Sequence, residues 1–310
     1  HDFRLDVCSN RNAGVGKIMA YLPEPGSLSC FSLNRPIQLA LGKFPVAAAI
    51  PLRNTPEIRQ QAYEEPTDII MTWYAALGAI EHGLVYGIMV IGVYLTFRIL
   101  DFPDLTVDGS LPLGAAISAV AITHGVNPYL SLLLALAGGF AAGMITAVLN
   151  TKFKILHLLA SILTMIALYS INIRIMAGPN VALLGVETVF DAVTRLGVPI
   201  HYAGLLIFGT FAGLVLSFII WFMGTEIGQA VLATGDNPQM ITSQGVNTHL
   251  IIILGVGLSN GLVALCGGLV AQNQGAADVG MGIGTIVAGL ASVIIGETIF
   301  GCQTMAKAFI

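Results

Sequence analysis

The sequence predicts an all-α fold, a polytopic transmembrane helix bundle, and two observations lead to this prediction. Of the 310 residues, 55% are hydrophobic and only 10% are charged, and the mean hydropathy is +0.84. A soluble globular domain carries about 25% charged residues, so this chain has too little polar surface to cover a globule of its size. The second observation is a series of apolar runs close to the length of about 20 residues that a helix needs to cross a bilayer.

The charged residues divide the chain into two parts. Residues 1–70 contain 7 of the 13 Lys and Arg and 7 of the 17 Asp and Glu, together with seven prolines. They have no sustained helical or strand periodicity. We expect them to be a poorly ordered extension or non-native upstream sequence, and we favour a start at Met71. Residues 71–310 form the expected transmembrane domain.

Seven apolar runs follow Met71, and each predicts a membrane segment. Charged residues, Pro or Gly interrupt the chain between them. The second run has only about 14 residues, which is short for a complete crossing. A further run begins at Met305 and stops at Ile310, so we expect the sequence to be truncated at its C-terminus. The predicted segments are 72–97, 111–124, 129–149, 155–176, 202–223, 250–270 and 283–300.

The distribution of Lys and Arg predicts the orientation of the bundle. If the turn at 150–154 is cytoplasmic, alternation of the segments also places the connection at 224–248 on the cytoplasmic side. The same alternation places four basic residues on the cytoplasmic side and two on the outer side, namely Arg98, Lys152, Lys154 and Lys307 against Arg174 and Arg195.

The composition excludes several classes of function. A net charge of -4 with scattered basic residues argues against a nucleic-acid partner. The four cysteines have no C-x-x-C spacing and the six histidines have no H-E-x-x-H arrangement, so no metal site is predicted. No G-x-S-x-G nucleophile motif occurs either. We therefore predict no catalytic residue and no cofactor, and we expect any nucleotide to bind to another chain.

The connection between the fifth and sixth predicted segments carries the signals of a short helix. Gly235 gives the chain a turn, Asp236 or Asn237 can cap the helix, and Pro238 suits its first position. Gly245 is placed to end it. A helix of about seven residues is not stable alone in water, so it needs a surface. It is either a connector packed on its own bundle or an element that docks into a cytoplasmic partner.

Asp101, Asp104 and Asp108 precede the short second segment. Ionised groups at membrane depth are costly and normally face protein or a water-filled cavity, and irregular backbone there has the same requirement. A broken helix pair beside a translocation route fits this pattern. The alternative is an interfacial loop that the three carboxylates share with Arg98. We add three polar residues to the candidate pathway, namely Asn172, Asn260 and Asp278.

Small and polar residues within the apolar segments predict contacts between helices. Gly139 and Gly143, like Gly257 and Gly261, have the spacing that lets helix backbones approach closely. Asn residues in such segments, including the candidate at 260, more often bond to a neighbouring helix than to a solute. Glu297 lies within the last predicted segment and requires a polar partner there.

Four stretches of sequence resemble a known family. They resemble permeases of ABC importers of the branched-chain amino acid group, in particular the subgroup associated with tryptophan or tyrosine uptake. The resemblance covers about residues 71–310, whereas residues 1–70 and the family's final helices have no counterpart. The stretches occur in the family's order and with similar spacing, at 94–110, 163–174, 233–240, and 278–284 with 295–297.

The resemblance implies a transport subunit of the bacterial inner membrane that is embedded in membrane lipid and is not an enzyme. Its implied partners are a second permease, in a homodimer or a heterodimer, two cytoplasmic ATPase subunits and an extracytoplasmic binding protein. The implied solute is small and organic, for example an aromatic or branched-chain amino acid. The outer loop would receive the binding protein, with Arg174, Glu187 and Arg195 as candidate contacts. The loop matching the family's coupling helix supplies the candidate ATPase contacts, Gly235, Asp236, Asn237, Pro238, Gln239, Met240, Gly245 and Asn247.

The main alternative is an ion-coupled secondary transporter that uses membrane carboxylates, namely Asp101, Asp104, Asp108 or Glu297. Inverted repeats would favour that class, and the sequence contains no convincing internal repeat. A membrane-embedded enzyme would require a cluster of His, Asp or Glu, or a Ser nucleophile with a base, and no such cluster stands out. The sequence therefore predicts an ATP-driven importer permease.

Overall fold

The computed structural model describes residues 68–194 and 200–300, and it describes the side chains of residues 75–191 and 202–299. Residues 67–310 form one compact unit. The predictions for residues 1–67, Arg195 and Lys307 lie outside the described residues. The first described helix begins at Asp68, directly before the apolar run that the sequence predicts.

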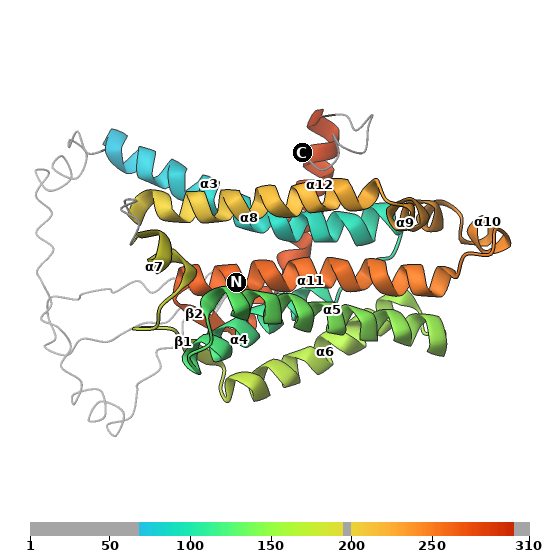
Figure 1. Ribbon diagram of the computed structural model, residues 1–310, viewed down its shortest axis with the longest axis horizontal. Coiled ribbons are helices and arrows are strands. Elements are labelled where there is room, and N and C mark those ends of the chain that lie inside the picture. The colour runs from blue at the N-terminus through green and yellow to red at the C-terminus, as the bar shows by residue number, and fades with distance from the viewer. Residues whose placement is uncertain (1–67, 195–199, 301–310) are drawn as a thin grey trace, which may run out of the picture. The chain divides into compact units, whose positions relative to one another are not determined.

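The described residues form a bundle of apolar helices (Figure 1), which confirms the predicted fold class. Six helices are long and apolar enough to cross a membrane, and a shorter apolar helix accompanies them. The long helices are α3 (Asp68–Tyr94, continued by the π-helical turn η1, Leu95–Ile99), α5 (Pro128–Phe153), α6 (His157–Met176), α8 (Ile200–Met223), α11 (Thr248–Gln274) and α12 (Thr285–Phe300). The shorter one is α4 (Val107–Thr123).

Short elements connect the long helices. Two strands, β1 (Asn180–Ala182) and β2 (Ala276–Asp278), pair antiparallel, and the 3-10 turn η2 (Val279–Gly282) follows β2. The remaining short helices are α7 (Val189–Thr194), α9 (Glu226–Asp236) and α10 (Pro238–Ser243).

Local capping signals explain where several helices begin and end. The side chain of Asn127 accepts a hydrogen bond from the backbone N–H of Tyr129, and Pro128 occupies the first position of α5. In α11, Asn247 is the corresponding N-cap and Gly275, at φ 68°, ends the helix in the left-handed conformation. These residues fix the turns between spanning helices independently of the apolar runs.

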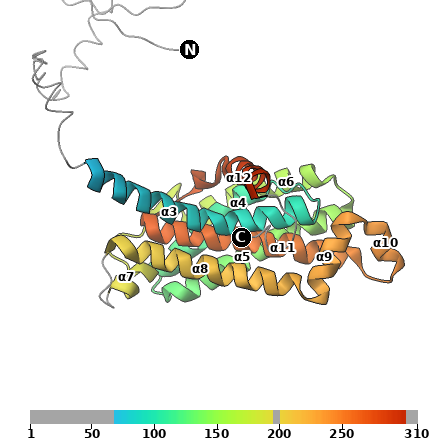
Figure 2. The ribbon, with the colours of Figure 1, turned by 90° about the horizontal axis from the view of Figure 1, so that it is seen from above.

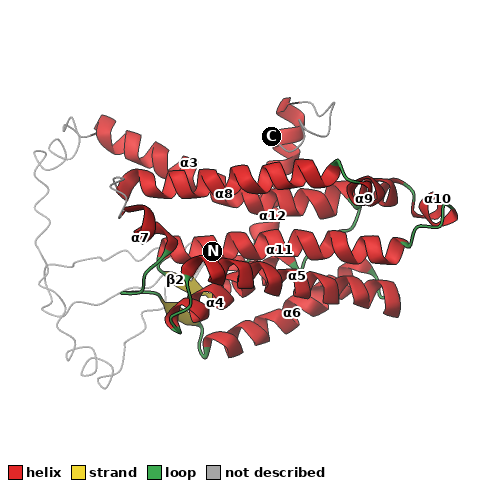
Figure 3. Cartoon of the chain, viewed as in Figure 1, coloured by secondary structure: helices red, strands yellow, loops and turns green. Residues whose placement is uncertain are grey.

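Apart from the connection between α3 and α4, which is described below, several connections between the long helices lie at one end of the bundle or the other. Helices α9 and α10 and the turn between α5 and α6 lie at one end, on the right in Figure 1. Helix α7 and the two strands, which are yellow in Figure 3, lie at the other end. The view from above also shows α7 and α10 at opposite ends (Figure 2). We call these the α10 end and the β-sheet end.

Helix α11 lies at the centre of the bundle, and nearly all of its residues from Val256 to Gln272 are buried. It contacts α3, α4 and α5. A Cβ atom at Gly139 or Gly143 of α5 would collide with the backbone of α11 at Asn260 and Val256 respectively. The glycine spacing therefore serves close helix packing, which confirms that prediction.

Helix α4 begins inside the bundle rather than at its end. The chain folds back over residues 100–106, and Asp104 reaches Asn260 of α11. Asn260 lies about 18 Å along α11 from Thr248, at 1.5 Å per residue. The irregular backbone is thus enclosed by helices, which is where a membrane protein tolerates it.

The predicted start of the second segment, at residue 111, is therefore wrong by one turn. The helix begins at Val107 and includes Pro112. The cluster of Asp, Gly, Ser and Pro at 108–112 resembles a turn in the sequence. Tertiary contacts of Asp108 and Ser110 make these residues helical instead.

Candidate translocation site and coupling surface

A buried polar cluster joins the fold-back to the central helix. Asp104 is fully buried, and its carboxylate accepts bonds from the backbone N–H of Thr106 at 2.9 Å and from Nδ2 of Asn260 at 2.6 Å. The other amide atom of Asn260, Oδ1, accepts a bond from Ser110 at 2.6 Å. The Thr106 hydroxyl lies 3.1 Å from that of Thr146 on α5. A buried carboxylate persists only with such partners, so the cluster fixes the start of α4 against α11.

Asp108 links α4 to the start of α12. Its carboxylate accepts bonds from the backbone N–H groups of Gly284 at 3.2 Å and Ile286 at 2.9 Å, and from the hydroxyl of Thr285 at 3.0 Å. The first N–H groups of a helix have no partner within it, and a negative charge is favourable there. Asp108 therefore caps α12 from another helix.

The other candidate carboxylates occupy separate positions. Asp101 is exposed, with a left-handed φ of 50°, where the chain leaves η1. Asp278 ends β2 and accepts a bond from the N–H of Gly280 at 2.6 Å, which begins η2. Of the six candidate pathway residues, Asp104 and Asn260 are joined by a hydrogen bond. Asp108 and Asn172 line one pocket, and Asp101 and Asp278 occupy two separate positions.

Asn172 and Asp108 line one pocket of about 270 Å³, which we call the α4–α6 pocket. Asn172 is fully buried, and its Nδ2 donates to the backbone carbonyl of Gly109 at 3.3 Å. Tyr169 precedes it by one turn of α6 and lines the same pocket, a residue that sequence reasoning missed. The full lining comprises Asp108, Gly109, Pro112, Met165, Ile166, Tyr169, Asn172, Val279 and Ile283.

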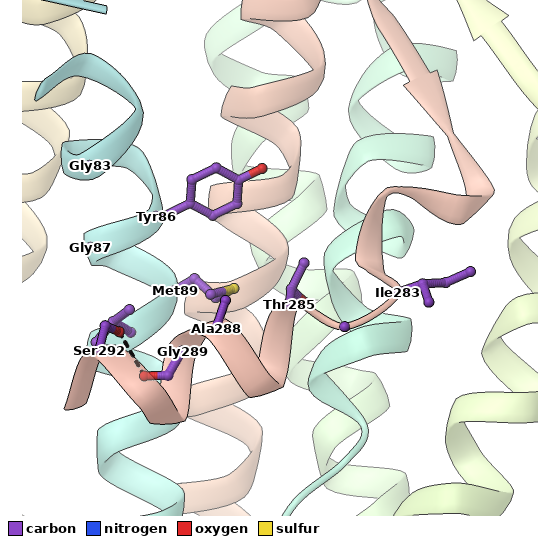
Figure 4. A pocket seen from close by; sticks show the side chains of 11 residues that line it. Gly83, Tyr86, Gly87, Met89, Ile283, Thr285, Ala288, Gly289 and Ser292 are labelled. Atoms are coloured by element: carbon purple, nitrogen blue, oxygen red, sulfur yellow. Dashed lines mark hydrogen bonds between the residues drawn. The ribbon is translucent and has the colours of Figure 1, made fainter. Parts of the chain in front are cut away.

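A larger pocket of about 590 Å³ lies between α3 and α12 (Figure 4), and we call it the α3–α12 pocket. Tyr86 and Met89 of α3 line one side, and Thr285, Ala288 and Ser292 line the other. The hydroxyls of Thr285 and Ser292 donate bonds to protein oxygens. The remaining lining is apolar or glycine, so this pocket offers little polar specificity.

The connection between α8 and α11 contains two short helices. Thr225 caps α9 by accepting a bond from the N–H of Gly228 at 3.3 Å. Asn237, rather than Asp236, caps α10 by accepting from the N–H of Met240 at 3.1 Å. Gly245, which follows the C-cap residue Gln244 of α10, has φ 86°. The predicted Asn cap and glycine end are therefore confirmed.

The prediction that Gly235 forms the turn before this helix is wrong. Gly235 lies within α9, and a Cβ atom there would collide with the carbonyl oxygen of Ile99 at the end of η1. Glycine is required because two backbones approach closely. In the sequence, a glycine followed by Asp-Asn-Pro has the same appearance as a turn.

Helix α10 presents an exposed surface at its end of the bundle (Figures 1 and 2). Ile241 points inward with 8% exposure, whereas Met240 is 57% exposed. Lys152 and Lys154, at the turn between α5 and α6 at the same end, are also exposed. The other exposed residues on and beside α10 are Asp236, Asn237, Pro238, Gln239, Thr242, Ser243, Gln244, Gly245 and Asn247.

The described candidates for binding-protein contact lie near the β-sheet end. Arg174 is exposed in the last turn of α6, and Glu187 is exposed before α7. Glu297 of α12 pairs with Arg98 of η1, with 2.9 Å between Nε and Oε1. Glu297 therefore has the polar partner that the sequence requires.

Apolar helices long enough to span a bilayer, with irregular backbone enclosed between them, indicate a multi-pass membrane protein. Residues 76–309 match the family described as branched-chain amino acid transport system / permease component, and the chain belongs to this family. It is thus the permease subunit of an ABC importer for a small solute, a multi-pass protein of the bacterial inner membrane and not an enzyme.

Three relatives illustrate the range of the family. The chain is 43% identical to the tyrosine transport system permease protein of Clostridioides difficile, over 74% of this chain and 76% of the relative. It is 34% identical to an uncharacterized protein of Rickettsia prowazekii, over 72% and 76%. It is 26% identical to the ribose import permease protein of Bacillus subtilis, over 78% and 71%. No solved structure matches the chain.

Proposed function

We propose that this permease imports an amino acid with an aromatic or branched side chain. The observation that carries the proposal is the 43% identity to a protein named as a tyrosine permease. More distant relatives are named for ribose and autoinducer 2, so membership of the family does not by itself define the solute. The higher identity to the tyrosine permease, over 74% of this chain, favours an amino acid as the transported solute.

We further propose that the permease works in a pair with a second copy or a related chain, with two cytoplasmic ATPase subunits and an extracytoplasmic binding protein. Arg174 and Glu187, together with Arg195, are the proposed contacts with the binding protein. The proposed permease domain comprises residues 71–310, and residues 1–70 are proposed to be either an extension to it or non-native upstream sequence. The start of the family match at residue 76 supports this boundary.

Helix α10 is the proposed element to which the ATPase binds. A helix of six residues is not stable alone in water. One face of α10 packs on its own bundle and the other is exposed, and this exposed face supports a role in binding a partner. The contacts are proposed for Gly235, Asp236, Asn237, Pro238, Gln239, Met240, Gly245 and Asn247. The surface carries few charges, so we expect binding through Met240 and hydrogen bonds rather than through ion pairs.

A continuous set of packed elements supports transmission from this helix to the pathway. Asn237 caps α10 and directly follows α9, and Gly235 of α9 packs against Ile99. Ile99 ends η1, and five residues later Asp104 bonds to Asn260 of the central helix. A rigid shift of α10 would therefore move the fold-back, which has the discrete contacts expected of a two-state element.

Transport assays with the reconstituted importer test this function. The tagged permease, with the ATPase and binding protein that co-purify with it, is placed in proteoliposomes and supplied with radiolabelled L-tyrosine. We expect uptake that requires ATP and persists with a protonophore or sodium ionophore. Uptake that an ionophore abolishes and that continues without ATP would support an ion-coupled transporter instead.

A further inference from the structure

We propose that the α4–α6 pocket binds the amino group of the transported solute, with Oδ1 of Asn172 as its acceptor and Tyr169 as the wall for an apolar side chain. This inference rests on the proposed import of an amino acid and adds a specific site for it. It concerns a pocket within one permease chain, separate from the surfaces proposed for the ATPase and the binding protein.

The orientation of the Asn172 amide defines what the pocket can accept. Nδ2 donates to the carbonyl oxygen of Gly109 at 3.3 Å. The flipped amide would place two oxygens against each other, so the hydrogen bond assigns Oδ1 to the other side. In the described part of the chain, this Oδ1 is a buried side-chain atom with no hydrogen-bond partner. A buried acceptor without a partner is unfavourable, so the site favours a ligand that donates.

Asp108 adds a negative charge to the same lining. Its carboxylate already accepts three hydrogen bonds from the start of α12, and a carboxylate has about four acceptor positions. Among the described residues that line the pocket, none is Lys, Arg or His. A protonated amine therefore suits the pocket, whereas a carboxylate alone has no cationic partner there.

The rest of the lining suits an apolar side chain. Pro112, Met165 and Ile166 are apolar, and Tyr169 provides an aromatic ring. Residues 169 and 172 are one helical turn apart, so the ring and the amide lie on one face of α6. An aromatic ring attracts both another ring and a cation. The volume of about 270 Å³ is below the range of about 300–1,000 Å³ for drug-sized ligands, so a single amino acid is the appropriate size.

The α4–α6 pocket lies beside the start of helix α12, so a ligand bound there can affect that helix. Asp108 caps α12, while Val279 and Ile283, which line the pocket, belong to the segment that leads into that helix. A ligand that contacts Asp108 would thus favour one arrangement of α12 over another. The α3–α12 pocket is larger but lacks a comparable unpaired polar group among its described residues.

Competition binding to the purified permease–ATPase complex, without binding protein, tests which group the pocket recognises. Radiolabelled L-tyrosine is displaced by tyramine, which has the amine and no carboxylate, or by 3-(4-hydroxyphenyl)propanoate, which has the carboxylate and no amine. We expect tyramine to displace the label and the propanoate to displace it at least about ten-fold more weakly. Equal or stronger displacement by the propanoate would overturn the proposal.

Variants locate the site. Asn172→Leu removes the acceptor and should weaken L-tyrosine binding by about 10- to 100-fold, the range for a hydrogen bond to a charged group. Asn172→Asp keeps an acceptor oxygen and should retain tyramine binding. Tyr169→Leu should also weaken binding, and since Tyr169 is 52% exposed the variant should fold. Ser170→Leu, an exposed neighbour outside the lining, is the matched control and should bind as the wild type does.

Two results separate this inference from the proposed function. If the wild-type importer transports L-tyrosine but Asn172→Leu and Tyr169→Leu both bind it with unchanged affinity, the pocket assignment is wrong and the function stands. Equal loss of binding in Ser170→Leu also contradicts the pocket. If the wild type does not transport an amino acid at all, the proposed function fails first. Should Asn172→Leu not be obtained, the competitors and Tyr169→Leu still decide the question.

Discussion

Asn260 of the central helix satisfies a buried carboxylate from another part of the chain. Its Nδ2 lies 2.6 Å from Asp104 and its Oδ1 accepts a bond of 2.6 Å from Ser110. We expect Asn260→Leu to lower the free energy of unfolding by about 1–3 kcal/mol or more, since it leaves polar groups unpaired. Thermal unfolding in detergent measures this. Thr146→Val, which removes one neutral contact of the same cluster, should cost less, and equal stability of all three proteins would contradict the assignment.

At the same scale, Glu297 provides the contrast of an exposed ion pair. The side chains of Arg98 and Glu297 are 65% and 28% exposed, and an ion pair that water reaches contributes about 0–1 kcal/mol. We expect Glu297→Gln to retain stability within that range and to retain ATP-dependent uptake. Complete loss of uptake with an intact fold would indicate a proton- or sodium-coupling role for this carboxylate.

Local sequence predicts some residue roles and not others. The Asn237 cap and the Gly245 terminus follow from adjacent residues, so the sequence contains their full signal. The capping of α12 by Asp108 joins residues 176 to 178 positions apart, and the bond between Asp104 and Asn260 spans 156 positions. A single sequence has no signal for such pairings, which tertiary packing decides.

At the scale of elements, the close approach of α9 to η1 is the expected link between the exposed helix and the fold-back. Gly235→Ala places a Cβ against the carbonyl of Ile99. We expect it to reduce transport while the complex retains ATPase activity and membrane insertion. Gly213→Ala on α8, where the described residues leave open space around the Cβ, is the matched control. It should transport normally and gain up to about 1 kcal/mol of stability.

The surface of α10 allows a second prediction about elements. Met240→Glu adds a charge to an exposed apolar contact point and should prevent stable binding of the ATPase, as measured by co-purification. Phe153→Glu, at the exposed end of α5, makes the same type of change outside α10 and should have a smaller effect. If both variants co-purify with as much ATPase as the wild type does, the ATPase does not bind to α10.

The spanning helices were predictable because apolar runs and their length follow directly from the bilayer. Predicted and observed boundaries differ by a few residues at most ends, where caps rather than hydropathy decide. The sequence allowed a broken helix near 101–108, but the contacts that hold the fold-back at 100–106 and the role of the glycine in α9 were not predictable. Asp, Gly and Pro signal turns locally, and the actual geometry comes from contacts with η1 and α11.

At the scale of the whole molecule, the described residues form a helix bundle with the short exposed helix α10 at one end and a polar fold-back in its interior. A shift of α10 by the ATPase would be transmitted through α9 and η1 to the start of α4, next to the α4–α6 pocket. Alternating access then needs only two arrangements of these packed elements, each favoured by a different ligand or nucleotide state.

The most direct test places α10 relative to the membrane and the ATPase. Met240→Cys, in a chain whose native cysteines are replaced, is treated with a membrane-impermeant maleimide in spheroplasts and in inside-out vesicles. The account predicts labelling only in inside-out vesicles, with protection when the ATPase is bound. Labelling of Met240→Cys from outside intact spheroplasts would contradict it.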